Sequence, residues 1–357
     1  MSDNFWEGKN VFLTGHTGFK GSWLSLWLQS LGSNVTGYAL PSSTNPNMYS
    51  LASVENEMTS IMGDLRDANN LFEALKRSKA EIVIHLAAQP LVRYSYDNPI
   101  ETYAVNVMGT INLLEAIRRC ETVRSFVNVT SDKCYENKEW NWAYRENEPL
   151  GGFDPYSSSK ACAELVTNAY RSSFFNSSNF ENHRIAIASA RAGNVIAGGD
   201  WSLDRLIPDL IRAAESNQEI AIRNPQSIRP WQHVLEPLKG YLLLAEHLYI
   251  HGPEFAEAWN FGPNDNDTKS VAQILDIFTH YWGRGIKINI KKDLNEPHEA
   301  FNLKIDSTKA KNRLGWFPRW NADESVRRTC AWFNAYINQE NMKLYALKEI
   351  SEYKMLN

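Results

Sequence analysis

The sequence of 357 residues lacks most features that mark metal-binding, membrane or nucleic-acid-binding proteins. Its four cysteines, at positions 120, 134, 162 and 330, have no CxxC spacing, which argues against a zinc site and fits reduced thiols. No apolar run is long enough to span a membrane, and the N-terminus carries no secretion signal. The net charge of −4 gives no reason to expect nucleic acid. We therefore expect a cytoplasmic protein with no metal, membrane or nucleic-acid partner.

The sequence does contain a regular alternation of short apolar strands and helical segments in its first half. The expected strands are 9–15, 34–40, 58–63, 81–88, 124–131 and 183–194. The expected helices are 19–32, 100–120 and 157–174, with further helices at 204–216, 234–248, 268–282 and 322–337. This alternation predicts an α/β fold with a doubly wound parallel sheet of the Rossmann type.

The chain is long enough for two domains, and the strand-helix rhythm loosens after about residue 190. Proline and glycine then mark loops at 197–202, 224–230 and 261–267. We expect residues 1–190 to form the Rossmann domain, with 231–260 returning to it. Residues 191–230 and 261–357 are then expected to form a smaller, mixed C-terminal domain.

A glycine-rich loop joins the first expected strand to the first expected helix. It reads "TGHTGFKG" and places Gly15, Gly18 and Gly21 where a backbone must approach a diphosphate closely. The helix that follows would offer free amides and the positive end of its dipole. We predict that this loop holds a dinucleotide through Gly15, His16, Thr17, Gly18, Phe19, Lys20 and Gly21.

The residues after the second expected strand bear on which dinucleotide binds. Positions 37–46 read "GYALPSSTNP", with neither an acid for a ribose hydroxyl nor a cation for a 2′-phosphate. The missing cation favours NAD over NADP. Asp64, after the third strand, is a candidate to accept a hydrogen bond from adenine, although "DLRD" can equally serve as a helix cap.

A tyrosine and a lysine stand four residues apart in "YSSSK", so on a helix Tyr156 and Lys160 share one face. An ammonium beside a phenol, near a cationic nicotinamide, lowers the pKa of the phenol. The phenolate can then take the proton of an alcohol as its hydride leaves. We expect Tyr156 and Lys160 to catalyse oxidation of a hydroxyl group.

These motifs resemble the extended short-chain dehydrogenase/reductase family, in its nucleotide-sugar branch, over nearly the whole chain. The resemblance is carried by "TGHTGFKG", "GDLRD", "HLAAQ", "NVMGT", "VTSDKCY", "YSSSKACAE", "RAGNVIAGGDW", "RPWQHV", "WNFG" and "LGW". It implies NAD as the cofactor, and a Rossmann domain that binds it beside a C-terminal domain that binds the nucleotide sugar. The further contacts to NAD that it implies are Asp64, Leu65, Leu86, Ala87, Ala88, Gln89, Asn106, Val129, Tyr156 and Lys160.

The segment "TSDKCY" (130–135) follows the apolar run "RSFVNV" of the expected strand and points to the reaction. Ser131 stands where the family keeps the hydroxyl residue that hydrogen-bonds the reacting hydroxyl. In the sugar-nucleotide 4,6-dehydratases an acid pair follows, usually Asp-Glu. Here the pair is Asp132-Lys133, which resembles the CDP-glucose 4,6-dehydratases more than the dTDP-glucose or GDP-mannose enzymes.

This resemblance implies oxidation of CDP-glucose at C4, loss of water across C5–C6 and return of hydride to C6. The product, CDP-4-keto-6-deoxyglucose, feeds deoxysugars of bacterial surface polysaccharides such as O-antigen. Asp132 is expected to protonate the leaving hydroxyl. Lys133 is expected either to remove the C5 proton or, while charged, to stabilise the enolate.

Several alternatives stay open at this point. A surface salt pair is the usual use of an adjacent acid and amine. A different nucleotide-sugar 4,6-dehydratase, a 4-epimerase or a simple dehydrogenase would share the scaffold, but an epimerase has no need of Asp132. A non-catalytic dinucleotide sensor is disfavoured by intact Ser131, Tyr156 and Lys160.

The resemblance also implies substrate contacts and an oligomer. The substrate contacts are Gln89, Ser131, Asn194, Arg229 and His298, with Asn194 and Arg229 on the diphosphate. Arg93 is a weaker candidate, Glu299 lies beside His298 in a segment that departs from the family pattern, and Arg191 fits a structural role. The helices 100–118 and 156–174 are expected to pair across a homodimer interface, and a tetramer is possible.

Overall fold

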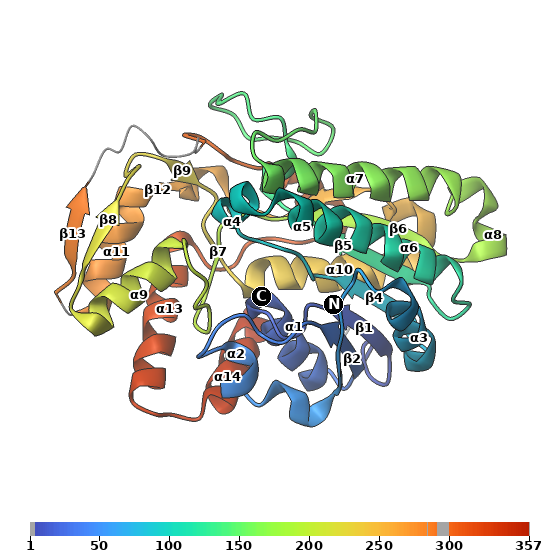
Figure 1. Cartoon of the computed structure of the whole chain (residues 1–357), viewed down its shortest axis with the longest axis horizontal. Helices are drawn as coiled ribbons and strands as arrows, with labels where there is room; N and C mark the ends of the chain where they lie inside the picture. The colour runs from blue at the N-terminus through green and yellow to red at the C-terminus, as the bar shows by residue number, and fades with distance from the viewer. Residues whose placement is uncertain (1–3, 284, 291–299, 357) are drawn as a thin grey trace.

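The computed structural model describes residues 4–283, 285–290 and 300–356 (Figure 1). Its centre is a seven-stranded parallel sheet with the order β11-β6-β5-β4-β1-β2-β3. The strands are β1 Asn10–Thr14, β2 Asn34–Ala39, β3 Thr59–Met62, β4 Ile82–His85, β5 Ser125–Val129, β6 Ala186–Arg191 and β11 Ala258–Asn260. The predicted doubly wound α/β sheet is confirmed.

The helices are α1 Phe19–Ser30, α2 Met48–Leu51, α3 Ala68–Ser78, α4 Val92–Asp97, α5 Pro99–Tyr103, α6 Gly109–Arg118, α7 Pro155–Ser173, α8 Phe180–His183, α9 Leu206–Ser216, α10 Leu235–His251, α11 Val271–Trp282, α12 Thr308–Leu314, α13 Ala322–Ile337 and α14 Met342–Met355. Short 3-10 turns lie at Val54–Glu57, Asp132–Cys134, Ser177–Asn179, Gly252–Phe255 and Asp265–Asp267. The helix predicted over 100–120 is interrupted: a π segment, Ala104–Met108, separates α5 from α6.

Strand residues alternate between two cores, one on each face of the sheet. In β4, Ile82 and Ile84 pack into the core that includes α1 and α10, whereas Val83 packs into the core that includes α3 and α6. This two-residue period is what pleated strands impose. Figure 1 shows α5, α6 and α7 running together along one side of the molecule.

After the loops and short strands that follow β6, the chain returns to the main sheet at α10 and β11. α10 packs against β5 and β6, and β11 adds an edge strand by pairing in parallel with β6. Within the described residues, three small two-stranded sheets lie outside the main one: β7 Val195–Ile196 with β10 Gln232–His233, β9 Ile228–Arg229 with β12 Lys269–Ser270, and β8 Glu219–Ile222 with β13 Lys287–Ile290. The division into domains at 190, 230 and 260 stays a prediction.

Local sequence explains where the helices begin and end. α7 starts after Asp154, whose carboxylate accepts a hydrogen bond from the Ser157 amide at 2.9 Å. α11 starts with a capping box between Ser270 and Gln273 and ends at Gly283, which is in the left-handed region at φ +68°. None of the helices in the described residues has the length and apolar character needed to cross a bilayer.

Candidate active site

The glycine loop joins β1 to α1 at the carboxyl end of the sheet. Gly15 has φ +79°, and a Cβ there would lie 2.7 Å from the Ala87 amide nitrogen. A Cβ on Gly21 would lie 2.0 Å from the Gly15 carbonyl oxygen. Glycine is therefore required at both positions. Gly18 is the N-cap of α1 and supplies no side chain to cap its amides, so the loop and helix start fit a diphosphate.

The two loop residues after Gly15 are held from within the protein. His16 is buried against Gly37, and its Nε2 lies 2.8 Å from the Ser60 hydroxyl. Burial lowers the pKa of His16 to about 4, so the ring is neutral at physiological pH. The Thr17 hydroxyl donates to the Leu40 carbonyl at 2.7 Å. These contacts stiffen the predicted phosphate loop.

The other predicted cofactor residues line up along neighbouring strand ends. Leu86 and Ala87 follow β4, where their amides donate to the Thr14 carbonyl and hydroxyl at 3.2 Å each. Leu65 packs against Gly109, Ala88 and Gln89 continue the β4 end, and Val129 ends β5.

Asp64 and Gln89 are already engaged by protein groups. Arg66 donates to Asp64 from Nε at 2.9 Å and also from Nη2, and this bond lowers the pKa of Asp64. The Gln89 side chain donates to the Leu91 carbonyl at 3.1 Å and the Thr102 hydroxyl at 2.9 Å. Their predicted ligand contacts remain predictions.

A cleft of about 710 Å³ opens beside the ends of β5 and β6. Of the predicted residues, Lys20, Arg93, Ser131, Asp132, Lys133, Tyr156, Asn194 and Arg229 line it. Gln89 and Lys160 are not among the described residues that line it. His298 and Glu299 lie outside the described residues. The fold thus brings Lys20 from the end of the glycine loop, the "SDK" segment and the tyrosine together in one cleft.

Ser131 organises the "SDK" turn. Its hydroxyl donates to Asp132 Oδ1 at 3.0 Å and accepts from the Lys133 amide at 3.2 Å. Asp132 is only 2% exposed, and its Oδ2 has no hydrogen-bond partner within the described residues. A Cβ on Gly193 would lie 2.0 Å from that oxygen, so glycine there makes room for the carboxylate. The side chain of Lys133 lines the cleft, and no ion pair joins it to Asp132 among the residues described.

Tyr156 and Lys160 lie on the first turns of α7, as the spacing predicted. Burial raises the pKa of Tyr156 to about 12, a hydrogen bond with Ser131 opposes this rise, and Asp132 adds to it. Burial lowers the pKa of Lys160 to about 8, opposed by Glu164. Burial is thus the largest influence on the pKa of Tyr156, and the lowering expected from Lys160 together with a cationic nicotinamide stays a prediction.

Two charged groups of the cleft, Asp200 and Arg205, had no role in the sequence predictions, and Lys20 was predicted only as a cofactor contact of the glycine loop. The Lys20 side chain lines the cleft, and burial lowers its pKa to about 8, with Arg205 and Lys160 lowering it and Asp132 and Asp200 raising it. Arg205 donates to Asp200 at 2.9 Å, and both line the cleft. Their loop, "GGDWSLDR", carried a motif in the sequence, but only the tertiary fold shows that it faces Tyr156.

The predicted diphosphate ligands occupy the far side of the cleft. Asn194 adopts φ +33° between β6 and β7. Arg229 is 4% exposed and donates to the carbonyls of Ile228 at 2.9 Å and Phe301 at 3.2 Å, among other contacts. Arg191 does not line the cleft in the described part of the chain: it is buried and paired with Glu164 at 2.8 Å.

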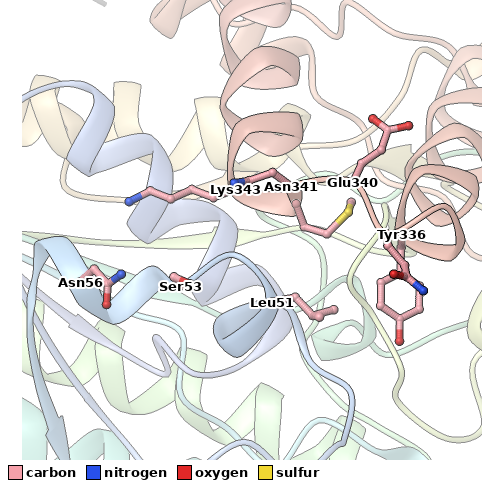
Figure 2. Close-up of a pocket in the computed structure, with 9 residues that line it drawn as sticks. Leu51, Ser53, Asn56, Tyr336, Glu340, Asn341 and Lys343 are labelled. Atoms are coloured by element: carbon pink, nitrogen blue, oxygen red, sulfur yellow. The ribbon is translucent and has the colours of Figure 1, made fainter.

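The described residues contain no cluster of three or more His, Cys, Asp or Glu suited to a metal ion. A separate cavity of about 560 Å³ lies between the turn near Ser53 and the connection from α13 to α14 (Figure 2). Among the residues described, Asn56, Tyr336, Asn341 and Lys343 help to line it, and none is a predicted site residue.

The chain is similar to known nucleotide-sugar dehydratases. A family model described as GDP-mannose 4,6 dehydratase matches residues 12–329. The CDP-glucose 4,6-dehydratase of Salmonella typhimurium is 54% identical over 353 residues, which cover 99% of this chain and 98% of that protein. The dTDP-glucose 4,6-dehydratase of Xanthomonas campestris is 24% identical over 340 residues, covering 90% and 92%.

Solved structures show the same fold. The dTDP-glucose 4,6-dehydratase from Streptomyces venezuelae, with NAD and TYD bound, has a TM-score of 0.79 at 20% identity, covering 92% of this chain and 98% of that one. The UDP-glucose 4-epimerase from Thermotoga maritima, with UDP-glucose, has a TM-score of 0.78 at 20% identity, covering 92% and 99%. Dehydratases and epimerases thus share this architecture.

Proposed function

Because the chain belongs to the GDP-mannose 4,6-dehydratase family, we propose that it is a CDP-glucose 4,6-dehydratase that uses NAD. The observation that carries this proposal is the 54% identity, over 99% of the chain, to the CDP-glucose 4,6-dehydratase of Salmonella typhimurium. The Asp132-Lys133 pair, in place of Asp-Glu, supports the same nucleotide.

NAD, when bound, would supply a hydride acceptor for C4 of the sugar and later a hydride donor for C6. The glycine loop supports this choice, since Gly15 and Gly21 leave room for a diphosphate that a Cβ would fill. Lys160 and Tyr156 on α7 and the strand ends at Ala87 and Val129 would complete its pocket.

Tyr156 would take the proton of the C4 hydroxyl, with Ser131 as its hydrogen-bond partner. Because burial raises the pKa of Tyr156, a nearby cation must assist its deprotonation. Lys160 and Arg205 lie near, and Arg205 already acts to lower that pKa. Oxidation at C4 acidifies the C5 proton and prepares the elimination.

Lys133 would take the C5 proton, and Asp132 would protonate the C6 hydroxyl as it leaves as water. The buried Oδ2 of Asp132, without a partner in the described residues, is suited to meet that hydroxyl. After hydride returns to C6, C5 regains a proton, so the net change is loss of one water.

Asn194 and Arg229 would hold the diphosphate of the nucleotide sugar, with Gln89 and His298 as further contacts. Arg229 already donates to backbone carbonyls, which fixes its guanidinium at the edge of the cleft. We extend the proposal to a homodimer or tetramer, to separate Rossmann and substrate domains, and to a cytoplasmic location. The four cysteines are free thiols, which supports the last point.

The test is to incubate the protein and NAD with CDP-glucose, dTDP-glucose, UDP-glucose and GDP-mannose in parallel. A 4-keto-6-deoxy product, detected by its absorbance in alkali, should form fastest with CDP-glucose. Faster turnover of any other sugar nucleotide would contradict the base specificity. Epimerised glucose without a keto product would contradict dehydration itself.

A further inference from the structure

A buried ion pair lies behind the cleft rather than in it. Glu164 of α7 and Arg191 at the end of β6 are joined at 2.8 Å, and each side chain is 3% exposed. Glu164 stands one helical turn beyond Lys160 on the same helix. Nothing in the proposed chemistry uses this pair, yet burying two charges is costly unless both are fully hydrogen-bonded.

The carboxylate of Glu164 is bonded to the start of the catalytic segment. The Thr130 hydroxyl, one residue before Ser131, donates to Glu164 Oε1. Ser189 on β6 donates to Oε2 at 2.6 Å, the oxygen that also accepts from Arg191. Glu164 therefore ties β5, β6 and α7 together at the point where the catalytic segment leaves β5.

The guanidinium of Arg191 is bonded to the end of the same segment. Its Nη1 donates to the Tyr135 hydroxyl at 2.9 Å and to the Glu146 carbonyl at 3.0 Å. The Tyr135 hydroxyl donates onward to Asn260 Oδ1 on β11 at 2.7 Å. The guanidinium also lies over the Tyr135 ring, 4.9 Å from its centroid.

We propose that the Glu164–Arg191 pair is a positioning device that clamps both ends of the segment Thr130–Tyr135 against α7, and that dehydration depends on it more than C4 oxidation does. This inference rests on the proposed function. The segment carries Ser131, Asp132 and Lys133, whereas α7 carries Tyr156 and Lys160.

The difference between the two steps follows from where each group is anchored. Lys160 is held by the backbone hydrogen bonds of α7, and the Tyr156 amide at the start of α7 donates to the Ser95 hydroxyl at 3.1 Å. Asp132 and Lys133 lie on a three-residue 3-10 turn, held by longer bonds such as Asp132 N to the Ala192 carbonyl at 3.4 Å. Small displacements of reacting groups cost large factors in rate, so loosening this turn should slow elimination first.

The test uses Thr130→Val and Tyr135→Phe, because both remove one link to the pair while leaving its charges in place. Single turnovers with CDP-glucose follow bound NADH at its absorbance band and the 4-keto-6-deoxy product by rapid quench. NADH formation should stay within about twofold of wild type, whereas product formation should slow on the order of tenfold. Bound NADH should therefore accumulate.

Ser189→Ala is the matched control. It removes a hydrogen bond to Glu164 from β6 but leaves Thr130 and Tyr135 linked, so it should lower the unfolding temperature without changing the ratio of the two rates. Thr130→Ser keeps the hydroxyl and should restore the wild-type ratio. If Ser189→Ala shifts the ratio as much as Thr130→Val, or if neither link variant shifts it, the clamp is wrong.

Crystal structures of the same variants separate this inference from the proposed function. Thr130→Val and Tyr135→Phe should displace the Asp132 carboxylate relative to the Tyr156 hydroxyl, and Ser189→Ala should not. That readout needs no turnover. A wild-type protein that makes no keto product would contradict the proposed function alone, and an unmoved Asp132 in both link variants would contradict the clamp alone.

Discussion

Asp132 and Lys133 are sequence neighbours with separate environments in the cleft. The Asp132 carboxylate is held by Ser131 and seated against Gly193, and the Lys133 side chain lines the cleft. The surface salt pair considered from the sequence is not formed, since Asp132 is 2% exposed and no ion pair between the two is found in the described residues. Separate groups can take separate roles as acid and base.

Substitution of each residue should stop the reaction at a different point. Asp132→Asn and Lys133→Met should both oxidise C4 and form bound NADH, yet stall before water is lost. With substrate deuterated at C5, Asp132→Asn should exchange the deuterium with solvent faster than it eliminates, because its base is intact. Lys133→Met should retain the deuterium. Rapid quench and mass spectrometry measure both.

A Lys133→Met enzyme that lost deuterium at the normal rate would rule out lysine as the C5 base. Its role would then be to stabilise the enolate with a positive charge.

Tyr156→Phe should lower the rate of C4 oxidation by roughly two to four orders of magnitude, the usual scale for a proton-transfer group. NAD binding should survive, because the glycine loop is a separate element. Tyr94→Phe is the control, since that hydroxyl donates to Glu101 at the surface. Stopped-flow absorbance of bound NADH measures the step, and a normal rate in Tyr156→Phe would exclude it as the base.

The sequence predicted the residues whose roles depend on short spacing. Tyr156 and Lys160 are four apart on one helix, and Ser131–Lys133 directly follow a strand, so local pattern placed them correctly. Lys20 was predicted as part of the glycine loop, but its approach to Asp132 and the bond of Arg205 to Asp200 could not be predicted, because they depend on how α1 and the 197–205 loop pack. The rise that burial gives the pKa of Tyr156 could not be predicted, because the extent of its burial is a property of the fold.

At the scale of elements, long periodic segments were predicted well and local irregularities were not. The π segment within 100–120 has no signal in hydrophobic spacing, yet it carries Asn106. The Asn106 side chain accepts from the Gln89 amide at 2.8 Å and donates to the Ser159 hydroxyl at 2.9 Å. A π segment often marks such a functional position. α3 and α14 were not predicted either.

The loop after β2 determines the cofactor prediction. It holds no cation between 37 and 46, and Arg66, which follows β3, is bonded to Asp64 at 2.9 Å. NAD should therefore support turnover much better than NADP, which needs a cation for its 2′-phosphate. Dissociation constants from quenching of tryptophan fluorescence, with kcat/KM for each cofactor, measure this. Equal turnover at sub-saturating levels would contradict it.

At the scale of the whole molecule, the buried side chains of Glu236 and Glu349 connect helix α14 to the rest of the protein. Glu236 of α10 accepts from the Trp320 amide and the Tyr353 hydroxyl at 2.7 Å each. Glu349 of α14 is 4% exposed, with Oε1 3.5 Å from His233 Nε2 and 3.9 Å from Arg328. Burial raises the pKa of Glu349 to about 8, while Arg328 opposes the rise and Glu352 and Glu324 add to it.

This raised pKa makes folding stability depend on pH. Glu349 holds its proton in the folded state up to about pH 8 but in the unfolded state only to about 4.5, so its contribution is full below 4.5 and is lost as pH rises through 8. Glu349→Gln should unfold near the wild-type temperature at pH 5 and a few degrees higher at pH 9. Glu352→Gln, a more exposed partner of Arg328, is the control. Equal melting curves at pH 9 would show that Glu349 ionises as easily in the folded state as in the unfolded state, so that its pKa is not raised.

The assembly prediction concerns the surface of α5, the π segment and α7. Ile100, Met108 and Leu165 are exposed by 85%, 50% and 56%, which gives this side three large apolar side chains that a second copy of the chain could cover. Figure 1 shows the helices that carry them side by side.

A charge buried at such an interface without a partner is strongly unfavourable. Ile100→Asp with Leu165→Glu should therefore shift the protein to monomers in light scattering coupled to size-exclusion chromatography. Leu344→Glu, at a residue 64% exposed on α14, should leave the assembly intact. An unchanged mass for the double variant would place the interface elsewhere.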